Sequence, residues 1–376
     1  MSSLTRRRRT WVCPHCFRRV GRAQIAYACV SGGSDCADGA GLRRADPLAG
    51  RAVCTVCRRS TTRLRCTACD GRFPEGYLRT PGRLVALAGP VGSGKSTYIG
   101  VLLHELLHRL GAELDAALMP CDDATMADYH ERYERHLYEA RHTVPKTAAG
   151  GGSSPLVYRL GRTRRGRFGR RRERVLTLVF LDTAGEHFTS QDRVESELRY
   201  LAEADAVIVL VDPLDLPGSP LDRPVGGPGT SGGSIEVLTR LLTHLRAAHG
   251  TAGDEKLTLP VAVALTKADL LWPHLPDNSP LHRGRRPGPV FDADDRLAVH
   301  TELDALLRRW NEDQLPLRLD RFCATYQLFA LSALGHAPHA TGGRLGDGGV
   351  VRPHRAEDPL MWLLHRFGVL DETGGR

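Results

Sequence analysis

A glycine-spaced segment, GPVGSGKS at residues 89–96, carries the clearest chemical signal in this chain. It fits the spacing G-x-x-x-x-G-K-[ST], in which backbone amides surround the phosphates of a nucleotide. The glycines permit the backbone turns, Lys95 is expected to reach the β- and γ-phosphates, and Ser96 is expected to ligate Mg²⁺. The expected phosphate-binding residues are Gly89, Gly92, Ser93, Gly94, Lys95, Ser96 and Thr97.

The segments on either side of this loop have the pattern that such a loop needs. RLVALAG at residues 83–89 has the apolar content of a buried strand. After the loop, apolar residues recur at helical spacing from Tyr98 to Leu110. We therefore expect the loop to open a helix whose N-terminal amides and dipole face the phosphates.

Polar motifs also follow three later segments that have the pattern of buried strands. RVLTLVFLDTAGEH at 174–187 runs into Asp182, LPVAVALTKAD at 259–269 runs into Thr266, and YQLFALSALG at 326–335 runs into Ser332. A further apolar strand, ADAVIVLVD, lies between the first two. Since doubly wound sheets bind ligands at the carboxyl ends of their strands, these motifs are expected at one site. Asp182 is expected to act on Mg²⁺, and the amide of Gly185 is expected to face a γ-phosphate.

In this order the phosphate loop, D-x-x-G, [NT]-K-x-D and S-A-[KL] motifs resemble a Ras-like GTPase of the translation-factor class, over roughly residues 82–335. The resemblance implies an α/β fold: a P-loop GTPase-like, doubly wound, mostly parallel sheet. It also implies that Asp269 pairs with the N1 and exocyclic amine of guanine and that Lys267 packs along the base. The amides after the last strand would approach guanine O6. The residues implied for base binding are Thr266, Lys267, Asp269, Ser332, Ala333 and Leu334.

Two departures from the Ras-like pattern bear on catalysis and base recognition. Glu186 stands where those enzymes place a water-orienting Gln, so slow intrinsic hydrolysis is expected, and His187 is an alternative group to position water. Thr266 replaces the usual Asn, which is expected to loosen base recognition. The switch threonine that would add a Mg²⁺ ligand is expected at Thr147, with Thr143 as the alternative. The expected catalytic set is Lys95, Glu186, His187 and Thr147.

A narrower resemblance comes from the cysteine-rich N-terminus, VPKT before the second strand and DPLMWLL near the end. Together with the GTPase motifs, these features are similar to the bacterial double-GTPase family. The resemblance implies GTP or GDP as ligand, a role in a multi-gene conflict or signalling system, and two protein partners: a second GTPase and a GTPase-activating-like protein.

Eight of the ten cysteines lie before residue 70. The clearest set is C-x2-C-x8-C-x2-C, whose two knuckle-like turns could aim four sulfurs at one tetrahedral ion. We expect Zn²⁺ there, and a second Zn²⁺ at the remaining four cysteines. The first expected site is Cys54, Cys57, Cys66 and Cys69, and the second is Cys13, Cys16, Cys29 and Cys36.

Two other interpretations of these cysteines are weaker. A thioredoxin-like redox pair is disfavoured because no βαβ pattern surrounds the motifs, and unligated thiols are disfavoured by their number. His15 could replace one ligand, although within a C-x-x-C turn it is expected to face solvent. Structural zinc is expected because this segment has few large apolar residues for a core. Cys121 and Cys323 stand alone as expected core residues.

The charge distribution is compatible with a nucleic-acid partner but does not favour one. The net charge is +9, and residues 1–80 carry 16 Lys and Arg against 5 Asp and Glu, so the remainder is slightly negative. Zinc bound by eight thiolates would lower the N-terminal excess further. A nucleic-acid-binding zinc-ribbon adaptor with a degenerate nucleotide domain remains the alternative function, which the intact nucleotide motifs disfavour.

The chain is expected to have two domains: a double zinc-binding module at 1–80 and a GTPase domain at 81–376 with a C-terminal helix. Loops are expected near 148–174, 216–234 and 335–356. The basic run at 163–174 could bind phosphate backbones or a partner, and a long basic hairpin tip is the alternative. MADYHERYERHLYEARH at 126–142 is expected to be a partly exposed helix. No secretory signal or membrane span is apparent, so a cytoplasmic location is expected.

Overall fold

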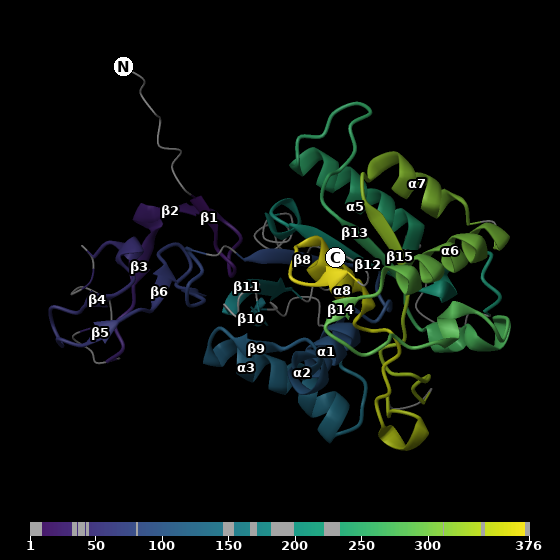
Figure 1. Cartoon of the computed structure of the whole chain (residues 1–376), viewed down its shortest axis with the longest axis horizontal. Coiled ribbons are helices and arrows are strands. Elements are labelled where there is room, and N and C mark those ends of the chain that lie inside the picture. The colour runs from purple at the N-terminus through teal and green to yellow at the C-terminus, as the bar shows by residue number, and fades with distance from the viewer. Residues whose placement is uncertain are drawn as a thin grey trace.

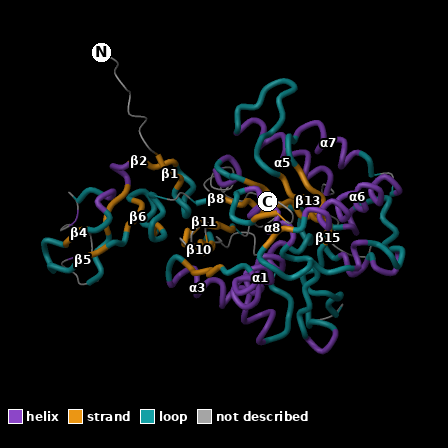
Figure 2. Tube along the Cα trace, in the orientation of Figure 1, coloured by secondary structure: helices purple, strands orange, loops and turns teal. Residues whose placement is uncertain are grey.

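The computed structural model describes residues 10–31, 36, 42, 45–79, 82–145, 154–165, 171–181, 199–221, 234–310, 312–339 and 343–372. A cysteine module (residues 10–79) lies beside a larger α/β domain (residues 82–372), as Figure 1 shows. Helices gather around the strands of the α/β domain, whereas the cysteine module consists mainly of short strands and loops (Figure 2). None of the described helices is both long and apolar enough to cross a bilayer.

A mostly parallel sheet forms the centre of the α/β domain. Seven described strands lie in the order β15-β13-β12-β8-β11-β10-β9. From β15 to β11 each neighbouring pair is parallel, whereas β10 is antiparallel to both β11 and β9. The strands are β8 (Arg83–Ala88), β9 (Ala116–Pro120), β10 (Leu156–Arg165), β11 (Arg171–Phe180), β12 (Ala206–Val211), β13 (Val261–Leu265) and β15 (Tyr326–Ala330).

Helices cover both faces of this sheet. The helices are α1 (Lys95–Glu105), α2 (Gly111–Glu113), α3 (Asp123–Tyr129), α5 (Ser234–Ala248), α6 (Ala293–Arg309), α7 (Gln314–Phe322) and α8 (Asp358–Arg366). Two π-helical segments, η5 (Leu106–Leu110) and η6 (His130–Glu139), continue α1 and α3. The fold is therefore the doubly wound α/β class that the sequence predicts.

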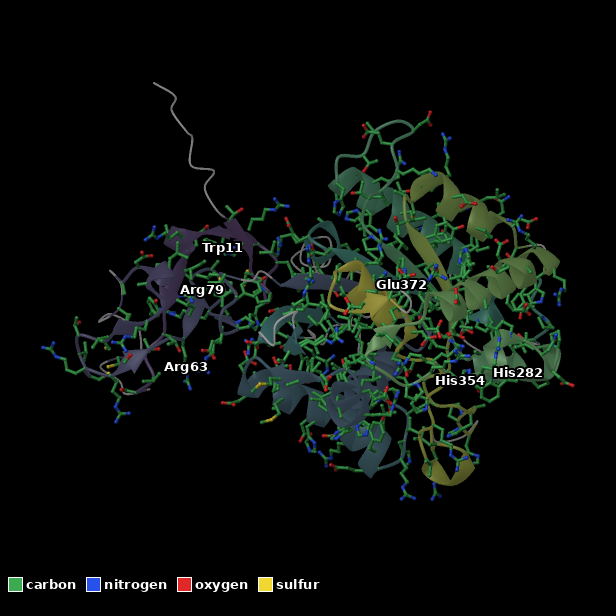
Figure 3. The ribbon with its side chains drawn as sticks, in the orientation of Figure 1. Trp11, Arg63, Arg79, His282, His354 and Glu372 are labelled. Atoms are coloured by element: carbon green, nitrogen blue, oxygen red, sulfur yellow. The ribbon has the colours of Figure 1, made fainter. Side chains whose placement is uncertain are left out.

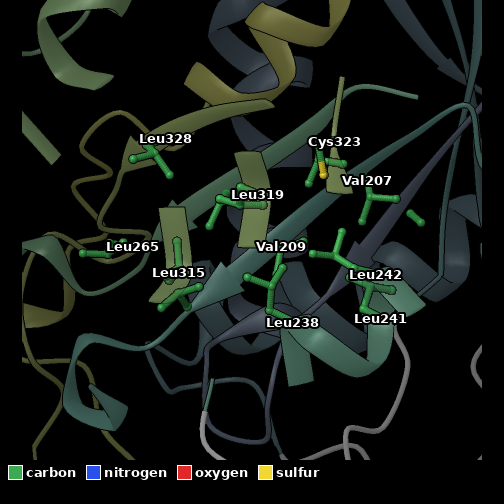
Figure 4. Close-up of a cluster of buried hydrophobic side chains, with 14 of the residues drawn as sticks. Val207, Val209, Leu238, Leu241, Leu242, Leu265, Leu315, Leu319, Cys323 and Leu328 are labelled. Atoms are coloured by element: carbon green, nitrogen blue, oxygen red, sulfur yellow. The ribbon is translucent and has the colours of Figure 1, made fainter. Parts of the chain in front are cut away.

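The two faces of β12 show why the central strands are apolar throughout. Val207 and Val209 pack with α5 and α7 on one face, as Figure 4 shows. Ile208 and Leu210 pack on the other face with α1 and α8. Every residue of β12 is buried because side chains alternate between two covered faces.

The segment at 148–174 is predicted to be a loop, but its described part contains strand β10 and the start of strand β11. β10 and β11 pair antiparallel from Leu156 opposite Phe180 to Arg165 opposite Arg171. The predicted loop is therefore wrong for the described part of this segment, and the alternative of a basic hairpin is confirmed there. β10 and β11 are paired at ten cross-strand positions, and the pairing continues beyond the buried part of the sheet. These cross-strand contacts outweigh the turn-forming composition of the segment.

A buried ion pair fixes the C-terminal helix α8 to α6. The Arg355 guanidinium is fully buried and donates to Asp295 at 2.8 Å and to Asp358 at 2.6 Å. Burial raises the pKa of Asp358 to about 7, although Arg355 acts in the opposite direction. Removing one partner of such a pair leaves an uncompensated charge, so this contact specifies how α8 is placed.

The cysteine module is made of short strands: β1 (Thr10–Val12), β2 (Arg19–Gly21), β3 (Ile25–Tyr27), β4 (Ala52–Val53), β5 (Ser60–Thr61), β6 (Leu64–Cys66) and β7 (Arg72–Phe73). A further small pair, β14 (Val290–Phe291) and β16 (Asp371–Glu372), belongs to the α/β domain. Trp11 packs in the core of the module, where its Nε1 donates to the Leu78 carbonyl at 3.0 Å. Figure 3 shows Trp11 and Arg79 in the module, away from His354 and Glu372 of the α/β domain.

One aromatic residue of the module belongs to the main core of the α/β domain. Phe17 is 2% exposed and contacts Tyr200, with ring centroids 4.9 Å apart. Beside it, the Arg19 Nε donates to both carboxylate oxygens of Glu203, at 2.7 and 2.9 Å. Tyr200 is in turn fixed to the sheet because its hydroxyl donates to the Val85 carbonyl at 2.7 Å. The module is thus docked through a buried apolar contact and a charged pair at its rim.

Replacing Phe17 by Ala should therefore destabilise the α/β domain as well as the module. We expect a loss of about 3–5 kcal/mol in the free energy of unfolding, measured by urea denaturation of the full chain. Val56→Ala is the matched control, because Val56 lies in the same module and is 48% exposed, so a change within about 0.5 kcal/mol is expected. Equal stabilities of the two variants would show that the docking contact contributes little.

Candidate functional site

The loop after β8 has the backbone geometry that its glycines predict. Gly92 and Gly94 have φ of 80° and 86°, in the left-handed region, and Gly94 is the N-cap of α1. At Gly89 a Cβ would lie 2.7 Å from the Leu210 carbonyl of β12, so any larger residue would collide with the neighbouring strand. The glycines therefore let the loop turn closely over the sheet edge into the first turn of a helix.

The polar side chains of the loop are held by its own backbone. Lys95 is 8% exposed, and its Nζ donates to the carbonyls of Gly89 at 2.8 Å and Pro90 at 2.9 Å. The fully buried Ser93 hydroxyl also donates to the Pro90 carbonyl, at 2.8 Å. The ammonium is thus placed within the loop, while Ser96 and Thr97 lie half-buried in the first turn of α1.

The loop after β13 is positioned by the end of β12. Thr266 is buried, and its amide and hydroxyl donate to the Val211 carbonyl at 2.9 and 3.3 Å. Lys267 has φ of 52°, and its Nζ lies 2.5 Å from Oδ2 of the buried Asp212. The left-handed backbone and this ion pair together fix the direction of the Lys267 side chain.

Asp269 differs from these buried groups because its carboxylate is only half-buried, in the 3₁₀ turn η9 (Ala268–Leu270). It forms no hydrogen bond or ion pair with another residue that the structure describes. A carboxylate held on a rigid turn without an internal partner keeps its acceptor oxygens for a ligand. This is the group predicted to pair with guanine.

The loop after β15 lies against the loop after β13. The Ala268 amide donates to the Leu331 carbonyl at 3.0 Å. Ser332 is paired in both directions with His354, at 2.9 and 2.8 Å, and its hydroxyl accepts from the Gly335 amide at 2.8 Å. Ala333 and Leu334 follow in the same turn, half-buried. The structure therefore brings the predicted base-binding segments together at one edge of the sheet.

Sequence reasoning did not identify Asp212 and His354 as parts of this arrangement. Asp212 directly follows β12, so its position at the carboxyl end of a buried strand was a usable signal. His354 lies in the segment predicted to be a loop, and no local pattern marks it. The backbone of His354 makes the contacts to Ser332, whereas its ring Nε2 is 2.8 Å from the Leu281 carbonyl, and burial lowers the pKa of the ring.

Several predicted residues lie outside the described part of the chain. These are Thr147, Asp182, Gly185, Glu186 and His187, so the proposed Mg²⁺ ligand and water-positioning groups stay predictions. Thr143, the alternative switch threonine, is described, and its amide donates to the Gly343 carbonyl at 2.7 Å.

The cysteines form two tetrads whose membership differs from the predicted one. One tetrad is Cys13, Cys16, Cys66 and Cys69, and the other is Cys29, Cys36, Cys54 and Cys57. The predicted grouping by nearest neighbours in the sequence is therefore wrong. The Cys66 turn joins the paired strands β6 and β7, and Cys66 packs with Cys13, Val20 and Ile25 in one buried cluster. His15 belongs to neither tetrad, and its Nε2 lies 2.7 Å from the Arg72 carbonyl.

The C-x-x-C turns have the geometry of zinc knuckles. In each, the residue after the second cysteine is left-handed, with φ of 57–61°, and its amide donates to the carbonyl of the first cysteine at 2.9 Å. These residues are Phe17, Arg58 and Asp70. Sulfur separations of 3.5–3.9 Å match the roughly 3.8 Å expected for tetrahedral Zn–S bonds of about 2.3 Å.

Both tetrads therefore have donor atoms and spacing suited to Zn²⁺. Hydrogen bonds from the thiols of Cys13 and Cys69 hold the pKa of Cys16 well below its ordinary value, while burial raises the pKa of Cys36 to about 12. Zinc binding would release the protons that remain on such thiols. Four thiolates on one ion leave no open coordination position, so the expected role is structural.

Paired serine substitutions distinguish the two groupings. Cys29→Ser with Cys57→Ser removes ligands from one observed tetrad and should leave about one zinc per chain by elemental analysis. Cys57→Ser with Cys66→Ser removes one ligand from each observed tetrad and should lower the zinc content toward zero. The reverse result, with zinc kept by the second variant and lost by the first, would support the grouping by sequence neighbours.

Two sequence comparisons show what this chain is similar to. A sequence model of the Double-GTPase 2 family matches residues 83–311. The chain is 31% identical over 329 residues to the proposed ESX-1 scaffolding and assembly protein SaeC of Mycolicibacterium smegmatis, covering 81% of this chain and 80% of that protein.

Similar solved structures are more distant. A chain of the signal recognition particle receptor SRb-GTP/SRX complex from Chaetomium thermophilum is 15% identical at a TM-score of 0.31, covering 69% of this chain and 95% of that one. A mutation variant of SsGBP is 12% identical at a TM-score of 0.30, covering 78% of this chain and 61% of that one. These two scores are too low to support an argument. The family match extends over most of the α/β domain and includes the phosphate loop, so this chain belongs to the Double-GTPase 2 family.

Proposed function

We propose that this protein is a GTP-binding switch that hydrolyses GTP slowly and acts through protein partners. The observation that supports the proposal is the shared edge of β8, β13 and β15, which carries the phosphate loop and the two segments predicted to bind the base. Hydrogen bonds from Thr266 to β12 and from Ala268 to Leu331 hold these segments at fixed separations. A nucleotide bound there would contact the loop with its phosphates and Asp269 with its base.

Each group in the site has a specific role in this proposal. Lys95 neutralises the β- and γ-phosphates, and Ser96 and Asp182 hold Mg²⁺. Thr147 and the amide of Gly185 respond to the γ-phosphate, while Glu186 or His187 faces the attacking water. The ion pair of Lys267 with Asp212 orients the lysine along the base.

The cysteine module supplies a docking surface in this proposal. Its Phe17 packs on Tyr200, which lies 13 residues after His187 in the chain. A change in the segment carrying Asp182 to His187 could thus alter how the module is held. The similarity to a proposed ESX-1 scaffolding and assembly protein supports protein partners within a secretion assembly rather than a conflict system. A second GTPase and a GTPase-activating-like protein are the partner classes expected from the family.

The rival function is a nucleic-acid-binding adaptor, and the salt dependence of binding to a nucleic-acid duplex tests it. A basic module that grips a phosphate backbone loses affinity steeply as salt rises. The docking of Phe17 and Arg19 on the α/β domain uses part of the module surface and favours the switch. The adaptor would be favoured if the full chain binds a generic nucleic-acid duplex at low salt and loses this binding at higher salt.

Asp269→Asn tests base recognition. The change replaces a carboxylate that accepts from two guanine donors, so GTP binding should weaken by about 2–4 kcal/mol and ATP binding should change little. Xanthine carries a carbonyl in place of the guanine amine, so the variant's amide should improve XTP binding. Asp277→Asn, on an exposed residue, is the control. Equal affinity of the unmodified chain for ATP and GTP would contradict guanine recognition.

Hydrolysis by the isolated chain should be slow. In related enzymes an arginine supplied from outside accounts for roughly 10³–10⁵ in rate, and Glu186 adds negative charge where water must be oriented. A single-turnover assay with GTP and Mg²⁺ measures this rate, and Lys95→Ala identifies turnover caused by contaminants. A rate near 1 s⁻¹, about the lower end of typical enzyme turnover, would show that no activating partner is needed.

A further inference from the structure

Three histidines and a glutamate lie together near the end of α1, away from the phosphate loop. His104 belongs to α1 and His108 to η5, while His130 and Glu134 belong to η6. The two helical segments approach closely at Gly100, where a Cβ would lie 2.9 Å from the Cβ of Tyr133. The sequence predicts only a partly exposed helix here, because the partners lie on segments far apart along the chain.

The Glu134 carboxylate lies at the centre of this group. Its Oε1 is 3.8 Å from His104 Nδ1 and 3.6 Å from His108 Nε2, and its Oε2 is 3.2 Å from His130 Nδ1. Only the contact to His130 is short enough for a hydrogen bond. Two imidazole nitrogens therefore face one carboxylate oxygen just beyond hydrogen-bond distance.

These separations are close to those of ligands on a common ion. One ligand atom each from His104, His108 and Glu134 lies within 4.8 Å of the others. Bonds of about 2.0–2.2 Å to a tetrahedral ion would set its ligands about 3.3–3.6 Å apart. The two histidine–glutamate separations, 3.8 and 3.6 Å, exceed these values by at most a few tenths of an ångström.

The surroundings hold the group in place and leave it accessible. The His104 ring stacks on Tyr138 with centroids 3.6 Å apart, and its Nδ1 lies 3.5 Å from the Tyr129 hydroxyl. The side chains of His104 and Glu134 are 23% and 27% exposed, whereas that of His108 is 56% exposed. An ion could therefore enter from the His108 side without unfolding the helices.

We propose that His104, His108 and Glu134 bind a divalent transition ion of the zinc class, with His130 orienting the carboxylate. Imidazole nitrogens suit such ions, whereas Mg²⁺ and Ca²⁺ prefer sites made of oxygen alone. Two histidines four residues apart on one helix face the same side, which suits a shared ion. The hydrogen bond to the second carboxylate oxygen is the kind of contact that fixes a ligand's orientation.

The position of this site gives the ion a structural effect. It would link the helix that starts at the phosphate loop to η6. From η6 the chain continues through His142, which bridges to Arg344, to Thr143. The ion would therefore hold the segment that precedes Thr147, independently of the two cysteine tetrads.

The test is a zinc titration of the full chain whose cysteine tetrads are already filled with zinc. Isothermal calorimetry should show one further equivalent of Zn²⁺. His108→Ala should weaken this step by at least about 100-fold, since even partners outside the ligand shell cost roughly 10- to 100-fold in metal affinity. Glu134→Gln is a second, conservative variant that should lose the step while keeping the helix.

His274→Ala is the matched control, because His274 is exposed and lies far along the chain from the cluster, so it should keep the further equivalent. Bound Co²⁺ provides a spectroscopic check, since imidazole and carboxylate ligands lack the thiolate charge-transfer band of cysteine sites. Hydrogen exchange of amides in 130–139 should slow when the ion binds. Absence of a further equivalent, or binding by the His108 and Glu134 variants that equals binding by the unmodified chain, would show that the cluster consists of histidine–carboxylate ion pairs only.

Discussion

The parallel pairing of β12 with β13 and of β13 with β15 is the constraint on which the rest of the site depends. In-register pairing from Val207 opposite Val261 and from Val261 opposite Tyr326 ends these strands at one edge. Backbone hydrogen bonds then extend the alignment into the loops, from Thr266 to Val211 and from Ala268 to Leu331. The segments predicted to bind the base consequently lie at separations set by the sheet, and side-chain packing only refines their directions.

The same edge receives the phosphate loop from β8, which pairs with β12. The missing side chain at Gly89 lets the loop pass the Leu210 carbonyl, so glycine there is a packing requirement as well as a conformational one. Lys95 and Lys267 are both held by oxygen atoms of the protein. The ammonium groups of these two lysines are therefore held on the loops where the phosphates and the base of a nucleotide are expected.

The cysteine module and the α/β domain depend on each other through Phe17. Its left-handed backbone is required by the first cysteine knuckle, while its ring packs against Tyr200 in the main core. Ordering of the knuckle by zinc would thus also fix an aromatic contact of the α/β domain. The interleaving of the tetrads adds to this dependence, since the Cys13 turn and the distant Cys66 turn would share one ion.

Local patterns made much of this structure predictable from the sequence. Apolar runs marked β8, β12, β13 and β15, and the glycine spacing marked the phosphate loop, because each signal lies within one segment. The cysteine grouping, the Lys267–Asp212 pair and the His354 bridge depend on which distant segments meet, so spacing alone did not reveal them. The strand from residue 174 was predicted, but its pairing with β10 through residues 161–165 and 171–173 was not, because the basic, glycine-containing sequence there has turn-like composition.

The identity of the nucleotide that the full chain retains shows whether the protein is a guanine-nucleotide switch. The purified protein is incubated with equal GTP and ATP in the presence of Mg²⁺, freed of unbound nucleotide, and denatured so that the bound nucleotide can be separated by chromatography. Lys95→Ala reports nonspecific retention. A guanine-nucleotide switch should retain close to one equivalent of guanine nucleotide per chain, and should retain no more adenine nucleotide than the Lys95 variant does. Adenine nucleotide in equal or greater amount, or no retention above that variant, would contradict this proposal.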